Sequence, residues 1–346
     1  MTRALALLTL IGCSGDTIHD QFDVVSDGAV IPVGVYGDIA SGTLVVYESG
    51  GPSGPGIAER MVDYIDFRDT LEQDVAIAFY DRRGTGNCTG DYDTEDITME
   101  ALIADLRAVT RVLDDRYAPE RKVLMGHSFG AMSAPLYLAE HPDTYDAWVA
   151  VAPAWTNQDV AMENAYRRLF LQRVATERIA IGDDDPMWPE ALAFCEEHPV
   201  IEPWSEAHER FYDDFLIPLG REFEPDPTMS TVGLLGTVFG TSYNLIDTQL
   251  RGNRISEAVW GDLDGVNLLD ELEQVDHPVL VVSGQYDAIG NTELGLAGLE
   301  RMATPEADKR LVQLDDGGHY PFDADPEGFR DEVLALIDRL DGAAGE

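Results

Sequence analysis

Residues 122–130 read KVLMGHSFG, and this stretch decides the fold. Its first half is apolar and predicts a buried strand, whereas the next residues, 131–134, begin a helical pattern. Between them lies a Gly-x-Ser-x-Gly sequence, in which a tight turn from strand to helix presents the serine outward. Glycines are needed beside the serine because such a turn leaves no room for side chains. We therefore predict that Ser128 is a nucleophile; the alternative is a small-residue turn that only packs a helix onto a sheet.

Strand and helix patterns alternate on both sides of this stretch. Short apolar runs predict strands, several of them too continuously apolar to have a face in water: residues 29–36, 43–47, 75–80, 147–151, 278–282 and 310–314. Apolar residues spaced by three and four predict helices between them, as over residues 102–113 and 329–340. This order is typical of an α/β fold with a mostly parallel, doubly wound sheet. We expect residues 29–153 and 267–342 to form that core.

The pattern changes between residues 154 and 266, where the chain becomes helical, aromatic and acidic. An insertion of this length between two core strands is most simply a helical lid, or cap, over the carboxyl edge of the sheet, where open α/β sheets bind ligands. We therefore expect an inserted lid domain over residues 154–266. A separate domain unrelated to the site is the alternative.

Two later loops supply the partners that a serine nucleophile needs. Serine reacts when a base takes its proton and a carboxylate orients that base, and in this type of fold the acid and then the histidine follow the serine. Asp287 lies just past the predicted strand 278–282, and His319 lies in the glycine-containing loop after strand 310–314. We predict a triad of Ser128, Asp287 and His319. Asp316 is an alternative acid, but it precedes the histidine in the same loop.

A glycine-rich turn after an early strand is the candidate oxyanion hole. Stabilising the developing negative charge requires two backbone N–H groups, one of which belongs to the residue after the nucleophile, Phe129. The sequence SGGPSGPG at residues 49–56 follows a predicted strand and can supply the second. We predict Gly51 as that donor, with Gly50 as the nearest alternative; a flexible linker is the structural alternative.

The net charge of the chain limits the classes of partner that it can bind. The 346 residues include 23 Lys and Arg against 65 Asp and Glu, for a formal net charge of −42. Such a field repels phosphate backbones and anionic lipids, so we expect no nucleic-acid partner, and it favours cations or amines. The balance resembles proteins from salty environments, although a merely acidic protein is an equal alternative. We expect no cofactor and no metal, because no strand precedes a Gly-x-Gly-x-x-Gly turn and no ligand cluster has metal-site spacing.

The first residues have the pattern of an export signal. Arg3 precedes an apolar run over residues 4–11, which is too short to span a bilayer. Leu10-Ile11-Gly12-Cys13 resembles the bacterial lipobox, which implies a signal peptide over residues 1–12, lipidation of Cys13, and a cell-envelope lipoprotein or secreted protein. Contact with a membrane is expected only through this anchor. The alternatives are a buried apolar strand and a misassigned start.

Two further cysteines, Cys88 and Cys195, remain after this segment. A disulfide between them is possible in a protein that folds outside the cytoplasm. Two unpaired thiols are equally compatible with the sequence, because spacing alone does not bring the two residues within bonding distance.

Three elements together resemble the α/β-hydrolase superfamily and, within it, the prolyl aminopeptidase (proline iminopeptidase) branch of serine peptidases. Gly50-Gly51-Pro52 resembles the HGGPG turn of that branch, and Asp81-Arg82-Arg83-Gly84-Thr85-Gly86 resembles its DQRGxGxS element. The third element is the Gly-x-Ser-x-Gly turn. The resemblance covers about residues 29–340. Ser49, Ser53 and Asn87-Cys88 depart from these patterns, which weakens the assignment of substrate more than that of mechanism.

The resemblance implies an α/β-hydrolase fold, the triad named above and a helical lid that selects substrates with a free N-terminus. It also implies that lid glutamates hold the substrate ammonium group, for which Glu163 and Glu206 are the candidates. The leading hypothesis is an aminopeptidase that releases N-terminal residues, of the proline type, from short peptides through an acyl-enzyme. The alternative is a carboxylic ester hydrolase that acts on small acyl compounds. A non-catalytic surface lipoprotein would not need the full set of Ser, Asp and His together with both oxyanion elements. The oligomeric state is not determined by the sequence.

Overall fold

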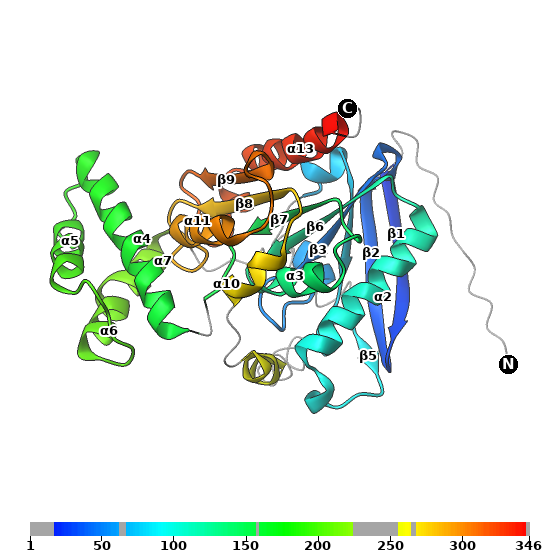
Figure 1. Cartoon of the computed structure of the whole chain (residues 1–346), viewed down its shortest axis with the longest axis horizontal. Coiled ribbons are helices and arrows are strands. Elements are labelled where there is room, and N and C mark those ends of the chain that lie inside the picture. Colours follow the sequence, from blue (N-terminus) through cyan, green and yellow to red (C-terminus); the bar gives the residue numbers. More distant parts are fainter. Residues whose placement is uncertain (1–16, 62–66, 157–158, 224–254, 264–267, 344–346) are drawn as a thin grey trace.

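The computed structural model describes residues 17–61, 67–156, 159–223, 255–263 and 268–343. Its centre is a nine-stranded sheet with the order β1-β2-β4-β3-β6-β7-β8-β9, and β5 pairs with β2 (Figure 1). The strands are β1 (Thr17–Ser26), β2 (Ala29–Asp38), β3 (Thr43–Glu48), β4 (Ala76–Tyr80), β5 (Thr89–Gly90), β6 (Arg121–His127), β7 (Ala147–Val151), β8 (Val279–Gly284) and β9 (Lys309–Leu314). All pairs from β4 to β9 are parallel, while β2 runs antiparallel to β1, β4 and β5. The expected α/β fold is confirmed.

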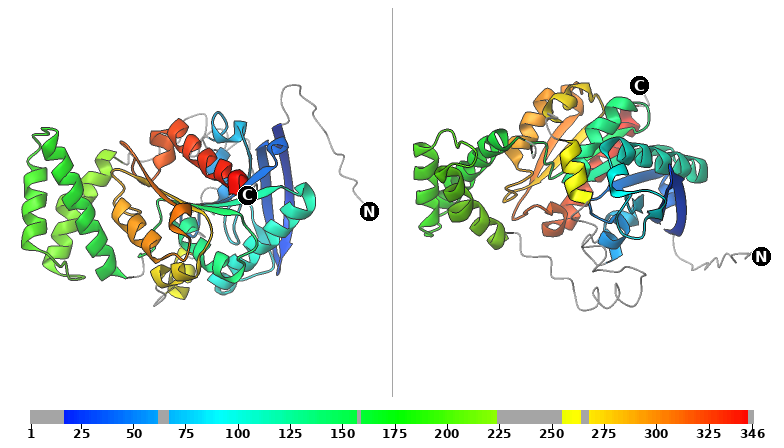
Figure 2. Two further views of the ribbon diagram at one scale, coloured as in Figure 1. Left: turned by 45° about the horizontal axis from the view of Figure 1, so that its top comes forward. Right: turned by 90° about the horizontal axis from the view of Figure 1, so that it is seen from below.

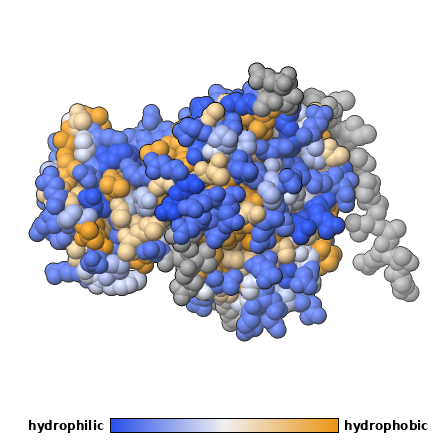
Figure 3. Space-filling view, in the orientation of Figure 1, coloured by the Kyte–Doolittle hydropathy of each residue, from blue (hydrophilic) through white to orange (hydrophobic). Residues whose placement is uncertain are grey.

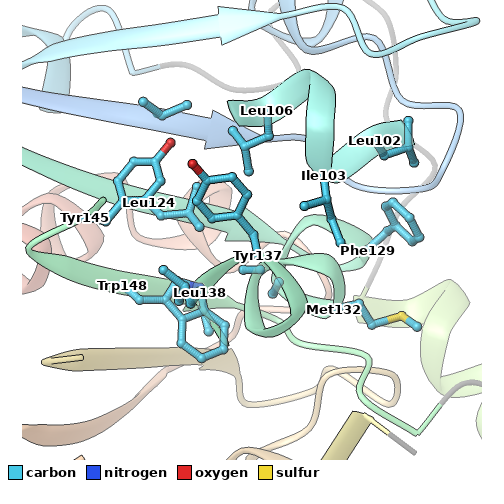
Figure 4. Close-up of a cluster of buried hydrophobic side chains, with 14 of the residues drawn as sticks. Leu102, Ile103, Leu106, Leu124, Phe129, Met132, Tyr137, Leu138, Tyr145 and Trp148 are labelled. Atoms are coloured by element: carbon cyan, nitrogen blue, oxygen red, sulfur yellow. The ribbon is translucent and has the colours of Figure 1, made fainter. Parts of the chain in front are cut away.

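Both faces of the sheet are covered, which explains why its strands read as continuous apolar runs. Alternate residues of β3 enter different cores, since Leu44 and Val46 belong to one cluster and Val45 and Tyr47 to the other. The first cluster lies under α2 (Met99–Tyr117) and α3 (Phe129–Glu140), and Figure 4 shows their side chains meeting. The second lies under α13 (Pro326–Ala343), which Figures 1 and 2 show on the opposite side of the sheet.

Shorter helices complete the core: α1 (Gly56–Met61), α10 (Leu268–Glu271), α11 (Thr292–Arg301) and α12 (Pro321–Ala324). Residues 255–262 form a further helix. None of the described helices combines the length and the apolar composition that a membrane span requires. Most of the face in view in Figure 3 is hydrophilic, in keeping with the composition.

Residues 160–223 form a separate group of helices, α4 (Val160–Ala180), α5 (Met187–Glu197), α6 (Glu206–Phe211) and α7 (Ile217–Phe223). They lie together beside α11 at one end of the molecule in every view (Figures 1 and 2). Their apolar side chains form a third core, which Tyr286 from the loop after β8 joins. This group falls within the segment predicted as a lid, and residues 157–158, 224–254 and 264–266 of that segment lie outside the described residues.

The two internal cysteines do not form the disulfide that the sequence left open. Cys88 and Cys195 are both free and buried. Cys88 packs in the core beneath α2, whereas Cys195 packs in the helical group, so the fold places them in different cores. The predicted signal peptide, residues 1–12, and the predicted lipidation site, Cys13, lie outside the described residues.

Candidate active site

Ser128 stands at the turn between β6 and α3 with a backbone that few residues adopt. Its φ is 51° and its ψ is −108°, a conformation disfavoured for any residue with a Cβ. The turn is closed tightly, because a Cβ added to Gly126 would lie 2.5 Å from the carbonyl carbon of Gly130. A Cβ added to Gly130 would lie 2.6 Å from the Cβ of Glu48 on β3. The glycines are therefore required by contact, as the sequence predicted.

The three predicted catalytic side chains lie together. His319 Nε2 lies 2.9 Å from Ser128 Oγ, and His319 Nδ1 lies 3.2 Å from each carboxylate oxygen of Asp287. Each residue comes from a loop that follows a parallel strand, namely β6, β8 and β9. The carboxyl ends of parallel strands meet at one edge of the sheet, so residues almost 200 positions apart converge there.

The electrostatics of the site favour a base that points at the serine. Asp287 is buried, and burial alone would raise the pKa of its carboxyl. The His319 ring and the amides of Ile289 and Gly290 lower that pKa by more than burial raises it, so the net pKa lies below its ordinary value. Those amides donate to Asp287 Oδ1 over 2.7 and 3.0 Å. An ionised carboxylate only accepts hydrogen bonds, so His319 Nδ1 carries a proton. In the neutral ring Nε2 is then free to accept the Ser128 proton.

His127 supports the base from the opposite side, a role that the sequence did not reveal. It is buried, and its Nε2 lies 2.8 Å from the carbonyl oxygen of His319. Burial, together with the neighbouring His319 ring, lowers the pKa of His127 to about 3, so the ring is neutral near pH 7. Because a carbonyl only accepts, Nε2 must be the protonated nitrogen. Its only signal in the sequence is its place directly before the nucleophile.

The glycine-rich turn of residues 49–56 lies against Ser128. A Cβ added to Gly50 would lie 3.6 Å from the Cβ of Ser128 and 2.7 Å from Nδ1 of His127. Gly51, the next residue, has a φ of +56°. Its carbonyl oxygen accepts a 3.2 Å hydrogen bond from the amide of Gly54, which closes the turn. The two predicted oxyanion donors, Gly51 and Phe129, therefore belong to segments that meet at the serine.

The element at residues 81–86 packs against this turn and binds it. Asp81 is fully buried and accepts hydrogen bonds from the amides of Ile57, over 3.1 Å, and Asn87, over 2.9 Å. Its backbone forms an isolated antiparallel bridge with Pro55. Arg82, also buried, donates to carbonyl groups of the turn. The two sequence elements that distinguish this chain from a generic Gly-x-Ser-x-Gly protein thus form one assembly.

The two lid carboxylates predicted to bind an amine lie on different helices of the helical group, α4 and α6. Glu163, on α4, pairs with Arg167 over 2.5 Å, and burial raises the pKa of its carboxyl. Glu206 is exposed in the first turn of α6. Neither carboxylate forms a hydrogen bond or ion pair with Ser128 or the other triad members in the described parts of the chain.

The helical group is fastened to the loop that carries Asp287. Arg173 on α4 pairs with Glu293 of α11 over 2.7 Å and donates to the carbonyl oxygen of Gln285 over 3.1 Å. The ring of Tyr286 stacks on Phe223 of α7 with centroids 3.8 Å apart. The residues directly before the proposed acid are therefore held by the helical group.

Within the described residues, no group of three or more His, Cys, Asp or Glu side chains is arranged to hold a metal ion. The chemistry that the site can perform with its own residues is nucleophilic attack by a serine hydroxyl with a histidine as the proton acceptor.

Comparisons with known proteins agree with this fold. A family model described as "Alpha/beta hydrolase family" matches residues 49–332. A relative from Bacillus subtilis (strain 168), named "Probable aminopeptidase YbaC", is 23% identical over 292 residues, which cover 83% of this chain and 86% of that protein. The solved proline iminopeptidase of Mycobacterium smegmatis superposes with a TM-score of 0.55 at 19% identity, over 94% of this chain and 100% of that one. A Pyrococcus furiosus esterase gives a TM-score of 0.55 at 15% identity, over 93% and 91%. At these identities the two structures establish a shared fold.

Proposed function

The chain belongs to the alpha/beta hydrolase family, and on that premise we propose that it is a serine hydrolase whose triad is Ser128, His319 and Asp287. One observation carries the proposal, namely the continuous hydrogen-bond chain from the Ser128 hydroxyl through both nitrogens of His319 to the buried Asp287. A structural role alone would not call for a buried carboxylate, a histidine and a strained serine at one edge of the sheet.

In the proposed reaction, Ser128 Oγ attacks the substrate carbonyl carbon while His319 Nε2 takes the hydroxyl proton. Asp287 holds the ring in the required tautomer and stabilises the imidazolium. The amide N–H groups of Gly51 and Phe129 stabilise the oxyanion. His319 then returns the proton to the leaving group, which departs and leaves an acyl-serine. A water molecule, deprotonated by the same histidine, releases the acid and regenerates the serine.

Within this class we propose an aminopeptidase that removes N-terminal residues, of the proline type, from short peptides. The three elements described in the sequence analysis support this substrate, as do the names of the Bacillus subtilis relative and of the Mycobacterium smegmatis structure. The formal net charge of −42 also favours a substrate that carries an ammonium group and disfavours nucleic acid. Glu163 and Glu206 stay predictions as amine ligands. We also propose that the chain is exported, as a lipoprotein anchored through Cys13 or as a secreted protein.

Hydrolysis of small carboxylic esters is the second candidate, and one observation favours it. An amine-binding carboxylate needs a free negative charge, whereas Glu163 is already paired with Arg167 over 2.5 Å. An ester substrate needs only the triad and the oxyanion hole. The same residues would perform both reactions, so the distinction lies in the need for a free amine.

The test compares three chromogenic substrates: a prolyl arylamide with a free amine, the same arylamide with its amine acylated, and a short-chain aryl ester. Wild type and Ser128→Ala are assayed in parallel at low and high salt. Cleavage of the free-amine arylamide alone supports the aminopeptidase, and cleavage of the ester alone transfers the proposal to the esterase. If no substrate reacts and a serine-directed phosphonate fails to label Ser128, the serine hydrolase proposal is wrong.

A further inference from the structure

We propose that Arg82 is a positioning residue that holds the two sides of the oxyanion hole in register. Its guanidinium group contacts the turn that carries Gly51 and also the side chain of Phe129. The inference rests on the proposed function, because it requires the amides of these two residues to stabilise the oxyanion. It assigns to Arg82 an indirect action through the backbone, with no contact to the substrate.

The first contact is a set of hydrogen bonds to the turn. Arg82 is 2% exposed, and its Nη1 donates to the carbonyl oxygen of Gly51 over 2.9 Å and to that of Pro52 over 3.5 Å. Its Nη2 donates to both the carbonyl oxygen and the hydroxyl of Ser49. That hydroxyl donates in turn to the carbonyl oxygen of Gly54 over 2.7 Å. One side chain therefore binds both arms of the turn.

These bonds determine which way the turn presents its amide groups. In a planar trans peptide the C=O and N–H point in opposite directions. Because the Ser49 carbonyl faces Arg82, the N–H of Gly50, the alternative donor, faces away from Arg82. The N–H of Gly51 lies in the next peptide unit, and the carbonyls on both sides of that unit, those of Ser49 and Gly51, bind Arg82. A Cβ added to Gly50 would meet first the His127 ring and then the Cβ of Ser128, so this part of the turn faces the nucleophile and its neighbour. Arg82 thus holds the carbonyl groups of Ser49, Gly51 and Pro52, which would repel an oxyanion, toward its own guanidinium group.

The second contact is with Phe129, the residue after the nucleophile. The guanidinium carbon lies 5.0 Å from the centroid of the Phe129 ring, within the range of a cation–π interaction. A second contact on the Phe129 ring comes from Trp260, whose ring meets it edge-on with centroids 5.7 Å apart. The ring is fixed from two directions, and its own amide begins α3.

The Arg82 guanidinium group lies in a buried ion pair with Glu48. Its Nε lies 3.8 Å from Glu48 Oε2, and both side chains are buried. Burial raises the pKa of Glu48 to about 7, although Arg82 opposes the rise. Buried ion pairs commonly add little to stability, because desolvation offsets their attraction. Arg82 also donates to the hydroxyl of Ser49, which stands where the HGGPG turn has its histidine.

The test compares Arg82→Lys, Arg82→Gln and Arg82→Ala with Arg83→Gln in the full chain. Arg83 is a matched control because it is buried in the same loop, but it binds Asp105 over 2.8 Å and the carbonyl groups of Ser26 and Asp27 on another side. We measure kcat and KM on an aryl ester, the melting temperature, and the rate of labelling by a serine-directed phosphonate.

Arg82→Ala is expected to lower kcat by about 10- to 100-fold, below the loss that removal of an oxyanion donor causes, with KM little changed. The kcat values of Arg82→Lys and Arg82→Gln should lie between those of wild type and Arg82→Ala. Millimolar methylguanidinium should restore part of the kcat of Arg82→Ala. Arg83→Gln should lower the melting temperature without this loss of kcat. Arg82→Lys and Arg82→Gln keep the test decisive if the alanine variant does not fold.

Two outcomes contradict the inference. If the Arg82 variants retain wild-type kcat, or lose kcat only in proportion to Arg83→Gln at equal folded fraction, Arg82 is a structural brace and the serine hydrolase assignment stands. If wild type neither turns over an ester nor is labelled at Ser128, the proposed function fails and the role of Arg82 fails with it.

Discussion

The carbonyl oxygen of His319 accepts a 2.8 Å hydrogen bond from Nε2 of His127. The centroids of the two rings lie 5.0 Å apart. The proposed base is therefore bound at its backbone by His127, the residue before the nucleophile, and at its side chain by Ser128. Because burial keeps His127 neutral near pH 7, this support adds no positive charge beside the base. The position of the His319 loop therefore depends on a residue that takes no proton in the reaction.

His127→Phe removes this hydrogen bond while filling the same aromatic surroundings, which include Tyr320 and Phe322. A typical hydrogen bond contributes about 1 kcal/mol, so we expect kcat to fall by roughly 5- to 10-fold with KM unchanged. His127→Gln keeps an N–H donor and should recover part of the rate. Steady-state kinetics measure both, and a wild-type kcat in His127→Phe would show that the bond does not position the base.

Asp287→Asn is expected to lower kcat by about 10⁴-fold, because the amide no longer selects the tautomer that leaves His319 Nε2 as the acceptor. Asp316→Asn is the matched control, since Asp316 is exposed in the loop before His319. It should retain wild-type kcat. Equal losses in both variants would mean that the acid has been assigned to the wrong residue.

Glu48 is expected to make the stability of the folded chain depend on pH. Burial raises the pKa of its carboxyl from 4.5 to about 7, so between these values the folded chain keeps a proton that the unfolded chain has released. The free energy of unfolding therefore decreases as pH rises through this window. Glu48→Gln has no such proton, so relative to wild type it should gain up to about 3 kcal/mol between pH 4.5 and 8. Urea unfolding at both pH values measures this, and parallel curves would contradict the shifted pKa.

Neither internal cysteine should react in the native protein. Burial raises the pKa of Cys195 to about 11 and raises that of Cys88 as well, which reduces the reactive thiolate. In a Cys13→Ser variant, a chromogenic disulfide reagent should find both thiols in urea without reductant and react only slowly in buffer. Absence of thiols in urea would instead establish a disulfide.

Added salt should raise the melting temperature. The formal net charge of −42 makes the folded chain repel itself, and the Debye length falls from about 10 Å at 0.1 M salt to about 3 Å at 1 M. A melting series in KCl measures the effect, and sucrose at equal osmolality separates ionic screening from solute exclusion. An unchanged melting temperature in KCl would show that the charges are too dispersed for repulsion to matter.

The core of the fold could be predicted because its strands are buried on both faces. β4 and β7 are apolar at every position, and β3, β6 and β8 are apolar in their central residues, which few other structures require. β1 was not predicted, because this edge strand alternates between exposed and half-buried positions and contains many polar residues. The arrangement of α4 to α7 beside α11 depends on packing that the sequence does not encode locally.

The candidate triad could be found from the sequence because chain order and loop chemistry restrict each member to one or two positions. Arg82 and His127 could not be assigned a role in this way, because each acts on a carbonyl group of a residue distant in sequence. Every residue has a backbone carbonyl group, so a hydrogen bond to one leaves no pattern of residue types in the sequence. Whether Cys88 and Cys195 form a disulfide likewise depends on the tertiary fold, which places the two residues in different hydrophobic cores.

The φ of 51° at Ser128 also matters to anyone who engineers this protein. Replacing such a residue by glycine relieves roughly 1–3 kcal/mol of backbone strain, so a screen for heat resistance would favour Ser128→Gly and deliver an inert protein. Ala118, at the end of α2, also has a positive φ, 45°, but with a ψ of 53° it is left-handed αL and has no chemical role, so glycine there is the safe exchange. A thermostability campaign must therefore be paired with an activity screen, because its most attractive backbone repair is the nucleophile.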